Sequence, residues 1–225
     1  MTTTVTPIRY PIICPTLPDP AELQADMKTI FSSGRVTVGE QVAGLEGDVC
    51  ERTGVAHTIA VSSGTSGLML LLRALKLPEG SEVITPSFTF AATSHALLWN
   101  GLVPVFCDSD PQMFTMDVKA AEALISEKTS AIYPVCVFGV PPDLDACQQL
   151  AQKYGLALLF DSAQGLGSTY KGKAVGNFGI GEAFSLSPTK VVTAMEGGLI
   201  TTNQDDLATQ LRYMRDYAKP PTARI

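Results

Sequence analysis

The chain has 225 residues, of which 45% are hydrophobic and 17% are charged, and its formal net charge is −6. This is the composition of a globular protein with one substantial core. No block of five or more basic residues occurs, so binding to a nucleic-acid backbone is not expected and any anion must be held by a local site. The longest apolar runs stop well short of a membrane span, and the N-terminus lacks the pattern of a secretory signal.

Cysteines and histidines exclude two further kinds of site. The five cysteines are scattered without a CxxC pair, which is typical of reduced cysteines in a cytoplasmic protein rather than of disulfides or zinc ligands. His57 and His95 are the only histidines, so a His-rich metal site is excluded, and both are more typical of structural positions than of a catalytic triad. We therefore expect a cytoplasmic protein without a metal, whose acid–base chemistry relies on another residue type.

Helical and strand patterns alternate along the chain. Two helices come first, one beginning after Pro20 and ending at Gly34, the other closing at Gly54. The predicted strands that follow are residues 57–62, 82–85, 103–108, 130–139, 156–161, 182–187 and 197–203. The predicted helices among them are residues 67–77, 91–101, 117–126, 143–155 and 205–218, and residues 168–176 have the pattern of a hairpin.

Apolar strands that alternate with helices predict an α/β fold with a mainly parallel sheet covered by helices on both faces. A small N-terminal segment is expected to join this body near Gly54. Ligands of such sheets bind outside the carboxyl ends of the strands. Four loops that follow predicted strands carry unusual residues and are expected to converge there: SSGTSG, PSFTF, DSAQ and SLSPTK.

The SSGTSG loop joins a strand to the start of a helix. Gly64 allows a tight turn, and Thr65 and Ser66 lie where the free N–H groups of a helix favour a phosphate. An ordinary Ser/Thr helix cap explains the same residues equally well.

The other three loops offer an aromatic face, a carboxylate and an amine. Phe88 and Phe90 are suited to stacking on a ring, although aromatic residues are more often buried. Asp161 follows five apolar residues, where it either pairs with a positive centre in a cleft or starts a turn. Ser185 can donate to a phosphate. Lys190 can supply an amine, although a lysine on a turn is usually a solvated charge.

Taken together, these groups match one cofactor. A flat phosphorylated ring with a protonated nitrogen and an aldehyde needs a phosphate cradle, a stacking surface, an acid and a lysine that forms an imine. Pyridoxal 5'-phosphate is such a molecule. A partly desolvated Lys190 can lose its proton, attack the aldehyde and later act as a base.

Five segments resemble the DegT/DnrJ/EryC1/StrS family of pyridoxal-phosphate-dependent nucleotide-sugar aminotransferases. They are VSSGTSGLMLLLRAL, EVITPSFTFAAT, VPVFCDSD, FDSAQGLGSTYKGKAVGNFG and AFSLSPTKVVTAMEGGLITTN, within a resemblance that runs from about Ser33 to about Tyr217. The resemblance implies a fold-type-I large domain with a seven-stranded-type sheet, and a homodimer. The implied organisation is an N-terminal helical segment, a cofactor-binding domain and a C-terminal tail, over residues 1–54, 55–217 and 218–225.

Matching motif positions imply the catalytic roles. Lys190 would form the Schiff base with the cofactor and, once freed, move a proton between the substrate carbon and the cofactor. Asp161 would keep the ring nitrogen protonated. Gln164 would lie beside the ring, near its phenolic oxygen.

The same matching assigns the rest of the pocket. The phosphate would be held by three hydroxyl residues and an opening glycine, namely Thr65, Ser66, Ser185 and Gly64. Phe90 is preferred over Phe88 as the aromatic that stacks on the ring. Glu196 would lie near the sugar side of the pocket.

Three features depart from the family pattern. Phe160 stands where most members have an acidic residue, and Val191 stands where an asparagine usually follows the lysine. Members also continue into a C-terminal small domain, whereas this sequence ends at MRDYAKPPTARI. We expect a fragment, a truncated gene product or half of a split enzyme, which binds the cofactor weakly or folds poorly because the surface for the small domain is exposed.

The resemblance implies transfer of an amino group from an amino acid, L-glutamate in most of the family, to a nucleotide-linked keto sugar. Such a reaction belongs to amino-sugar, cell-surface polysaccharide or secondary-metabolite biosynthesis. Lys190 argues against the dehydratases of the family, which have a histidine there. One alternative is an inactive cofactor-binding or regulatory module of the same fold. The other, a nucleotide-dependent oxidoreductase, is disfavoured because the strand after SSGTSG ends in Thr85 and Pro86 instead of an acidic ribose partner.

Overall fold

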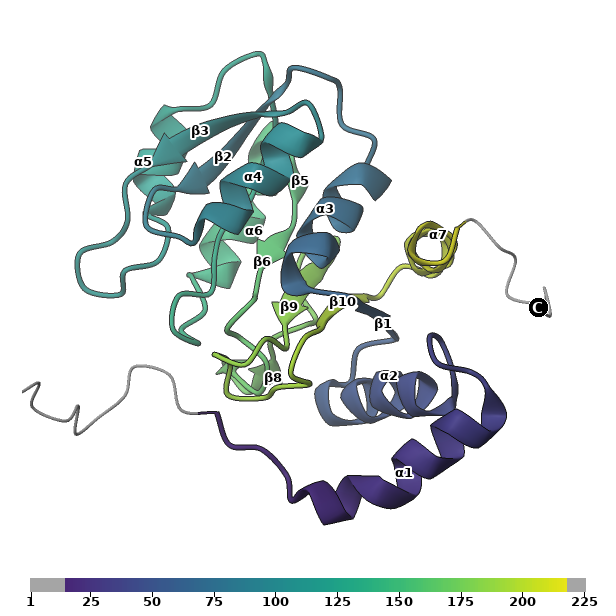
Figure 1. The fold of residues 1–225 in the computed structure, drawn as a ribbon. Helices are drawn as coiled ribbons and strands as arrows, with labels where there is room; N and C mark the ends of the chain where they lie inside the picture. Colours follow the sequence, from purple (N-terminus) through teal and green to yellow (C-terminus); the bar gives the residue numbers. More distant parts are fainter. Residues whose placement is uncertain (1–14, 218–225) are drawn as a thin grey trace, which may run out of the picture.

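A single layer of strands forms the centre of the computed structural model, which describes residues 15–217 (Figure 1). One group of strands is hydrogen-bonded in the order β1 (His57–Val61), β10 (Gly198–Thr202), β9 (Glu182–Ser185) and β6 (Phe160–Asp161). The other has the order β3 (Val103–Cys107), β2 (Glu82–Pro86), β4 (Thr129–Ile132) and β5 (Ala157–Leu158).

The two groups join into one sheet. Only Leu159 separates β5 from β6, and Asp161 forms a parallel bridge to Val135, just beyond β4. Because β5 and β6 together occupy one strand position, the layer has the seven positions expected of it. Strand β10 is antiparallel to both its neighbours, and the other pairings within the layer are parallel. The prediction of a mostly parallel α/β sheet is confirmed.

Helices cover both faces of this layer. One face carries α3 (Gly64–Ala74), α4 (Ala91–Trp99) and α7 (Asp205–Arg215), and the other carries α2 (Glu40–Thr53), α5 (Val118–Ala123) and α6 (Leu144–Tyr154) (Figure 1). Leu71, Leu97 and Leu211 of the first set share one apolar cluster with strand residues. Cys147 and Leu150 of α6 lie in a second cluster with Phe160. The core is therefore split by the sheet, as in other doubly covered layers.

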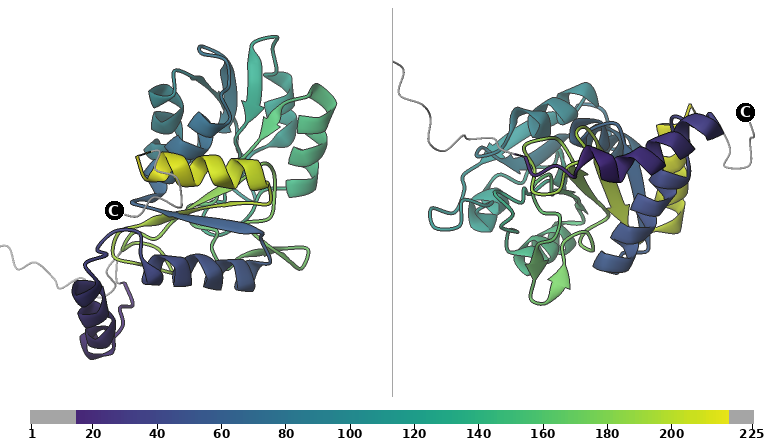
Figure 2. Two further views of the ribbon diagram at one scale, coloured as in Figure 1. Left: turned by 90° about the vertical axis from the view of Figure 1, so that its right-hand side faces the viewer. Right: turned by 60° about the horizontal axis from the view of Figure 1, so that its bottom comes forward.

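Helix α1 and the hairpin depart from this layered plan. Helix α1 (Pro20–Ser33) has no buried residue and extends away from the body (Figure 2). Strands β7 (Thr169–Tyr170) and β8 (Lys173–Ala174) form the predicted hairpin. Its two turn residues, Lys171 and Gly172, both have positive φ, as a tight two-residue hairpin turn requires.

Several predicted boundaries are wrong, and two of these differences have a physical reason. Helix α3 begins at Gly64 rather than residue 67, so the SGTS segment forms the cap and first turn of the helix instead of a loop. Strand β4 ends at Ile132 rather than residue 139, with Pro134, which cannot donate to a ladder, two residues further on. Beyond this proline the chain keeps only isolated bridges, at Val135 and Val137.

The predicted division into segments remains a prediction. Helix α2 belongs to the proposed N-terminal segment, yet its Val49 is buried in one cluster with Leu186 and Leu199. The proposed tail, residues 218–225, lies outside the described residues. Within residues 15–217 no helix is long and apolar enough to cross a membrane, and no group of side chains is suited to hold a metal ion.

Candidate active site

The four unusual loops leave the sheet at the same edge. Strands β1 and β9 run in the same direction because both are antiparallel to β10, and β6 is parallel to β9. The β2 strand is parallel to β4, which is parallel to β5. The segments that follow β1, β2, β6 and β9 therefore meet at the carboxyl edge, as the sequence predicts.

The start of α3 is built as a cap that leaves two N–H groups free. Ser63 Oγ accepts a hydrogen bond from Ser66 N (3.1 Å), and Ser66 Oγ accepts one from Ser63 N (3.0 Å). This reciprocal pair is a capping box. Within the described residues, Gly64 N–H and Thr65 N–H donate to no acceptor. The helix cap expected of SSGTSG is confirmed, while the phosphate role stays a prediction for which these two N–H groups are available.

Gly64 brings this helix end against the end of β9. A Cβ atom on Gly64 would lie 2.7 Å from Ser185 Cβ, closer than side chains approach. The absence of a side chain therefore lets Ser185, from a segment more than a hundred residues away, lie beside Thr65 and Ser66. The hydroxyl of Ser66 is engaged in the capping box, so Thr65 and Ser185 carry the more available hydroxyls of the predicted phosphate set.

Asp161 is a buried carboxylate with few donors. It is 3% exposed and lies at the end of β6, where Oδ2 accepts from Thr93 Oγ1 (2.6 Å) and Oδ1 from Ala163 N (3.1 Å). Burial raises the pKa of Asp161, the two hydrogen bonds oppose that rise, and the positive charge of Lys190 opposes it further. A carboxylate desolvated in this way gains most from a cation placed against it.

Thr93 was not predicted from the sequence as a site residue. It lies on α4, one turn after Thr89, and the two hydroxyl oxygens are 2.7 Å apart. Thr89 belongs to PSFTF and Thr93 to the helix that follows it, and this i, i+4 spacing is the sequence signal that could have indicated the pair.

Replacing Thr93 with valine is expected to lower the free energy of unfolding by about 1–3 kcal/mol, because a buried carboxylate loses a donor. The variant should also raise the pKa of Asp161 further above its ordinary value. Urea unfolding measures the first effect, and carboxyl carbon NMR shifts measure the second. Thr89→Val, whose hydroxyl reaches Asp161 only through Thr93, is the control. Equal effects of the two variants would contradict this assignment.

Lys190 lies on the turn that follows β9. Its N–H donates to Ser187 O (3.0 Å), its side chain is half-buried, and its charge reaches Asp161. Gln164 lies on the neighbouring loop, where Oε1 accepts from Phe138 N (2.6 Å). The structure thus brings Lys190 and Asp161 into electrostatic range and fixes Gln164 at the same edge.

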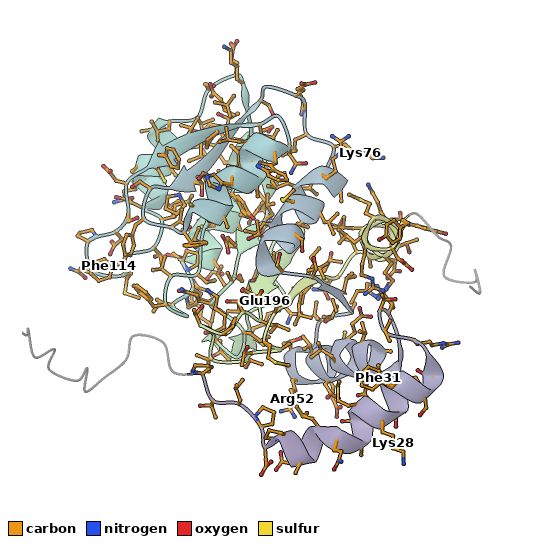
Figure 3. The ribbon with its side chains drawn as sticks, in the orientation of Figure 1. Lys28, Phe31, Arg52, Lys76, Phe114 and Glu196 are labelled. Carbon is orange, nitrogen blue, oxygen red and sulfur yellow. The ribbon has the colours of Figure 1, made fainter. Side chains whose placement is uncertain are left out.

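The two candidate aromatics differ in their surroundings. The ring of Phe88, which is 46% exposed, lies 6.0 Å from that of Phe114 and 6.2 Å from that of Phe138. Phe90 precedes α4 and is 80% exposed. Phe90 is therefore the more exposed of the two, and its role as the stacking residue stays a prediction. Glu196 is exposed on the segment between Lys190 and β10 (Figure 3).

The chemistry of this edge limits the ligand that it suits. Free N–H groups favour a phosphate, and a desolvated carboxylate near a lysine favours a ligand with a cationic ring and an electrophilic carbon. On a doubly covered, mostly parallel sheet these features define the class of pyridoxal-phosphate-dependent transferases. The model of the DegT/DnrJ/EryC1/StrS aminotransferase family matches residues 19–224, and the chain belongs to this family. Its members use pyridoxal phosphate.

Similar proteins include two curated enzymes. A UDP-N-acetyl-3-dehydro-alpha-D-glucosamine 3-aminotransferase of Acidithiobacillus ferrooxidans is 40% identical over 197 residues, which are 87% of this chain and 53% of that enzyme. A GDP-perosamine synthase of Caulobacter vibrioides is 38% identical over 188 residues, covering 84% and 51% of the two chains. The chain therefore spans about half the length of the curated relatives it matches.

Solved structures agree with this assignment. The crystal structure of DesI in the presence of its TDP-sugar product superposes with a TM-score of 0.86 at 38% identity, over 91% of this chain and 52% of that one. The structure of a 3-amino-5-hydroxybenzoic acid synthase gives a TM-score of 0.87 at 29% identity, over 94% and 56%. The chain therefore has the fold of the large domain of such enzymes.

Proposed function

We propose that this chain provides the cofactor site of an aminotransferase that moves an amino group from an amino acid to a nucleotide-linked keto sugar. The observation that carries the proposal is the buried Asp161 within electrostatic range of Lys190 at the carboxyl edge of the sheet. Both curated relatives are named for nucleotide-sugar chemistry, one on a UDP-linked and one on a GDP-linked sugar.

The residues of the edge fit pyridoxal phosphate. The phosphate would lie at the start of α3, held by Gly64 N–H, Thr65 and Ser185 with Ser66 fixing the helix end. Phe90 would cover one face of the ring, and Gln164 would lie beside it. When bound, pyridoxal phosphate supplies an aldehyde carbon and a ring that accepts electrons.

Lys190 and Asp161 would carry the chemistry of the protein itself. The Nζ amine of Lys190 would hold the cofactor at its aldehyde carbon, and as a free amine it would move a proton to and from the α-carbon of the amino donor. Asp161 would stay ionised against the protonated ring nitrogen, with Thr93 and Ala163 holding its two oxygens. Because Asp161 is buried, this ion pair is stronger than it would be in water.

The finer parts of the proposal come from the family. L-Glutamate is the proposed donor, and a homodimer in the cytoplasm is the proposed working form. The reduced state of the four described cysteines, Cys50, Cys107, Cys136 and Cys147, is compatible with that compartment.

A spectroscopic half-reaction tests the proposal. The purified chain is mixed with pyridoxal phosphate, and the visible absorption band is followed after addition of L-glutamate, with D-glutamate as the control. We expect a band that L-glutamate bleaches with release of one 2-oxoglutarate per site, whereas D-glutamate leaves it unchanged. A band that neither isomer bleaches would overturn the aminotransferase and identify a cofactor-binding module without turnover.

A further inference from the structure

Glu182 is a buried acid for which the proposed chemistry has no use. It opens β9, is 1% exposed, and accepts three hydrogen bonds. Its Oε2 accepts from Ser162 Oγ (2.5 Å), and its Oε1 accepts from Gly176 N (2.7 Å) and Phe178 N (2.9 Å). A carboxyl group inside an apolar layer is costly, and these three hydrogen bonds offset part of that cost.

Ser162 places this acid next to the candidate site. Ser162 directly follows Asp161, and successive residues of a strand point to opposite faces of the sheet. Accordingly, Asp161 bonds Thr93 of α4 on one face, while Ser162 bonds Glu182 on the other, with Cys136 Sγ 3.3 Å from its hydroxyl. The strand end that carries Asp161 is therefore held from both faces.

The other oxygen of Glu182 binds a different segment. Gly176 and Phe178 lie on the connection between the β7–β8 hairpin and β9. Both donate backbone N–H groups to Oε1, so one side chain ties this connection to the strand end at Ser162.

We propose that Glu182 is a positioning residue for Asp161: through Ser162 it fixes the strand end that carries the carboxylate, and it couples that strand end to the connection at Gly176–Phe178. The consequence for a bound cofactor rests on the function proposed above. The coupling between the strand end and the connection does not depend on a bound cofactor.

The hydrogen bond between Glu182 and Ser162 can run in either direction. Burial raises the pKa of Glu182 to about 7, although the hydrogen bonds and the charge of Lys173 oppose this rise. When Glu182 is ionised, the Ser162 hydroxyl donates to it; when Glu182 is protonated, it donates to Ser162, whose proton turns toward Cys136 Sγ. Cys136 stays a thiol throughout, because burial raises its pKa. Across the sheet, Asp161 is the other acid near this pair, and burial raises its pKa as well.

Backbone NMR on the chain without cofactor tests the coupling. Amide shifts of Ala163, Gly176 and Phe178 are followed through the titration of Glu182, around pH 7. We expect all three to move with one midpoint in the parent chain and none to move with that midpoint in Glu182→Gln. In Ser162→Ala, Gly176 and Phe178 should still titrate while Ala163 no longer follows them.

The matched control is Glu82→Gln. Glu82 also opens a strand and accepts a serine hydroxyl, from Ser126 (2.6 Å), but it lies on β2, which pairs with β3 and β4 and with neither β6 nor β9. The Glu82→Gln variant should leave the titrations of all three amides unchanged. An Ala163 amide that does not follow the other two in the parent, or that still follows them in Ser162→Ala, would overturn the coupling. If Glu182→Gln does not fold, Ser162→Ala still decides the question.

A second measurement links the coupling to the cofactor. With pyridoxal phosphate added, the pH midpoint of the visible band should shift in Glu182→Gln by about threefold or more in the proton dissociation constant, and should stay in place in Glu82→Gln. A midpoint that is the same in both variants would refute the effect on the site. Absence of any band in the parent would count against the proposed function alone, since the amide titrations need no cofactor.

Discussion

Lys190→Ala is expected to abolish the visible absorption band that the parent chain forms with pyridoxal phosphate, because no other amine lies on the turn after β9. Loss of the same amine removes the group that moves the proton, and general base catalysis typically contributes about 10²–10⁴-fold. We expect the half-reaction with L-glutamate to slow by about three orders of magnitude or more. Absorbance measures the band, and release of 2-oxoglutarate measures the rate of the half-reaction.

Lys153→Ala provides the control for this variant. Lys153 lies on α6 and pairs with Glu122 (2.7 Å) on the exposed side of that helix. Its replacement should leave the band and the half-reaction at parental levels. A persistent band in a folded Lys190→Ala protein would show that another lysine holds the cofactor.

Gly198→Ala is expected to destabilise the chain by about 3 kcal/mol, at the upper end of overpacking effects. A Cβ atom on Gly198 would lie 2.5 Å from Ser63 C and 2.6 Å from Gly64 N, both of which are backbone atoms that cannot rotate away. The start of α3 would have to move off β10. The free N–H groups of Gly64 and Thr65 would move with it, so the affinity for pyridoxal phosphate should fall as well.

The neighbouring glycine is a matched control. A Cβ atom on Gly197 would meet nothing closer than Leu186 Cβ at 3.5 Å, which is an ordinary contact. Gly197→Ala should therefore shift the midpoint of urea unfolding little, whereas Gly198→Ala should lower it strongly. If the two variants unfold at the same urea concentration, the close approach of α3 to β10 is wrong.

Local patterns account for most of the fold. Gly34 and Gly54 end α1 and α2 with positive φ, and Lys171 with Gly172 turns the hairpin, so these features follow from residues that lie together in the sequence. Apolar runs likewise predict the strands, although the run over 130–139 extends past Pro134. Cys136 beyond this proline is still buried, in one cluster with Phe184 and Leu199, so an apolar run alone does not separate a buried segment from a regular strand.

The candidate site likewise contains residues that a local sequence pattern predicts and residues that it does not. Asp161 and Lys190 stand out because a polar residue follows an apolar strand, and the topology brings both to one edge. Thr93 and Glu182 gain their importance only from partners 68 and 20 residues away, Asp161 and Ser162. Their hydroxyl and carboxyl groups look ordinary in the sequence, since contacts across the sheet are set by tertiary packing. The helix cap at Ser66 can be predicted from the motif itself, and the structure shows this cap.

Chemical trapping of the lysine that holds the cofactor tests the proposed site most directly. The parent chain is incubated with pyridoxal phosphate, reduced with borohydride and digested, and the modified lysine is located by mass spectrometry. We expect one predominant modification, at Lys190, in the peptide that contains SLSPTK. A folded chain that carries the modification at another lysine, or none at Lys190, would contradict this expectation.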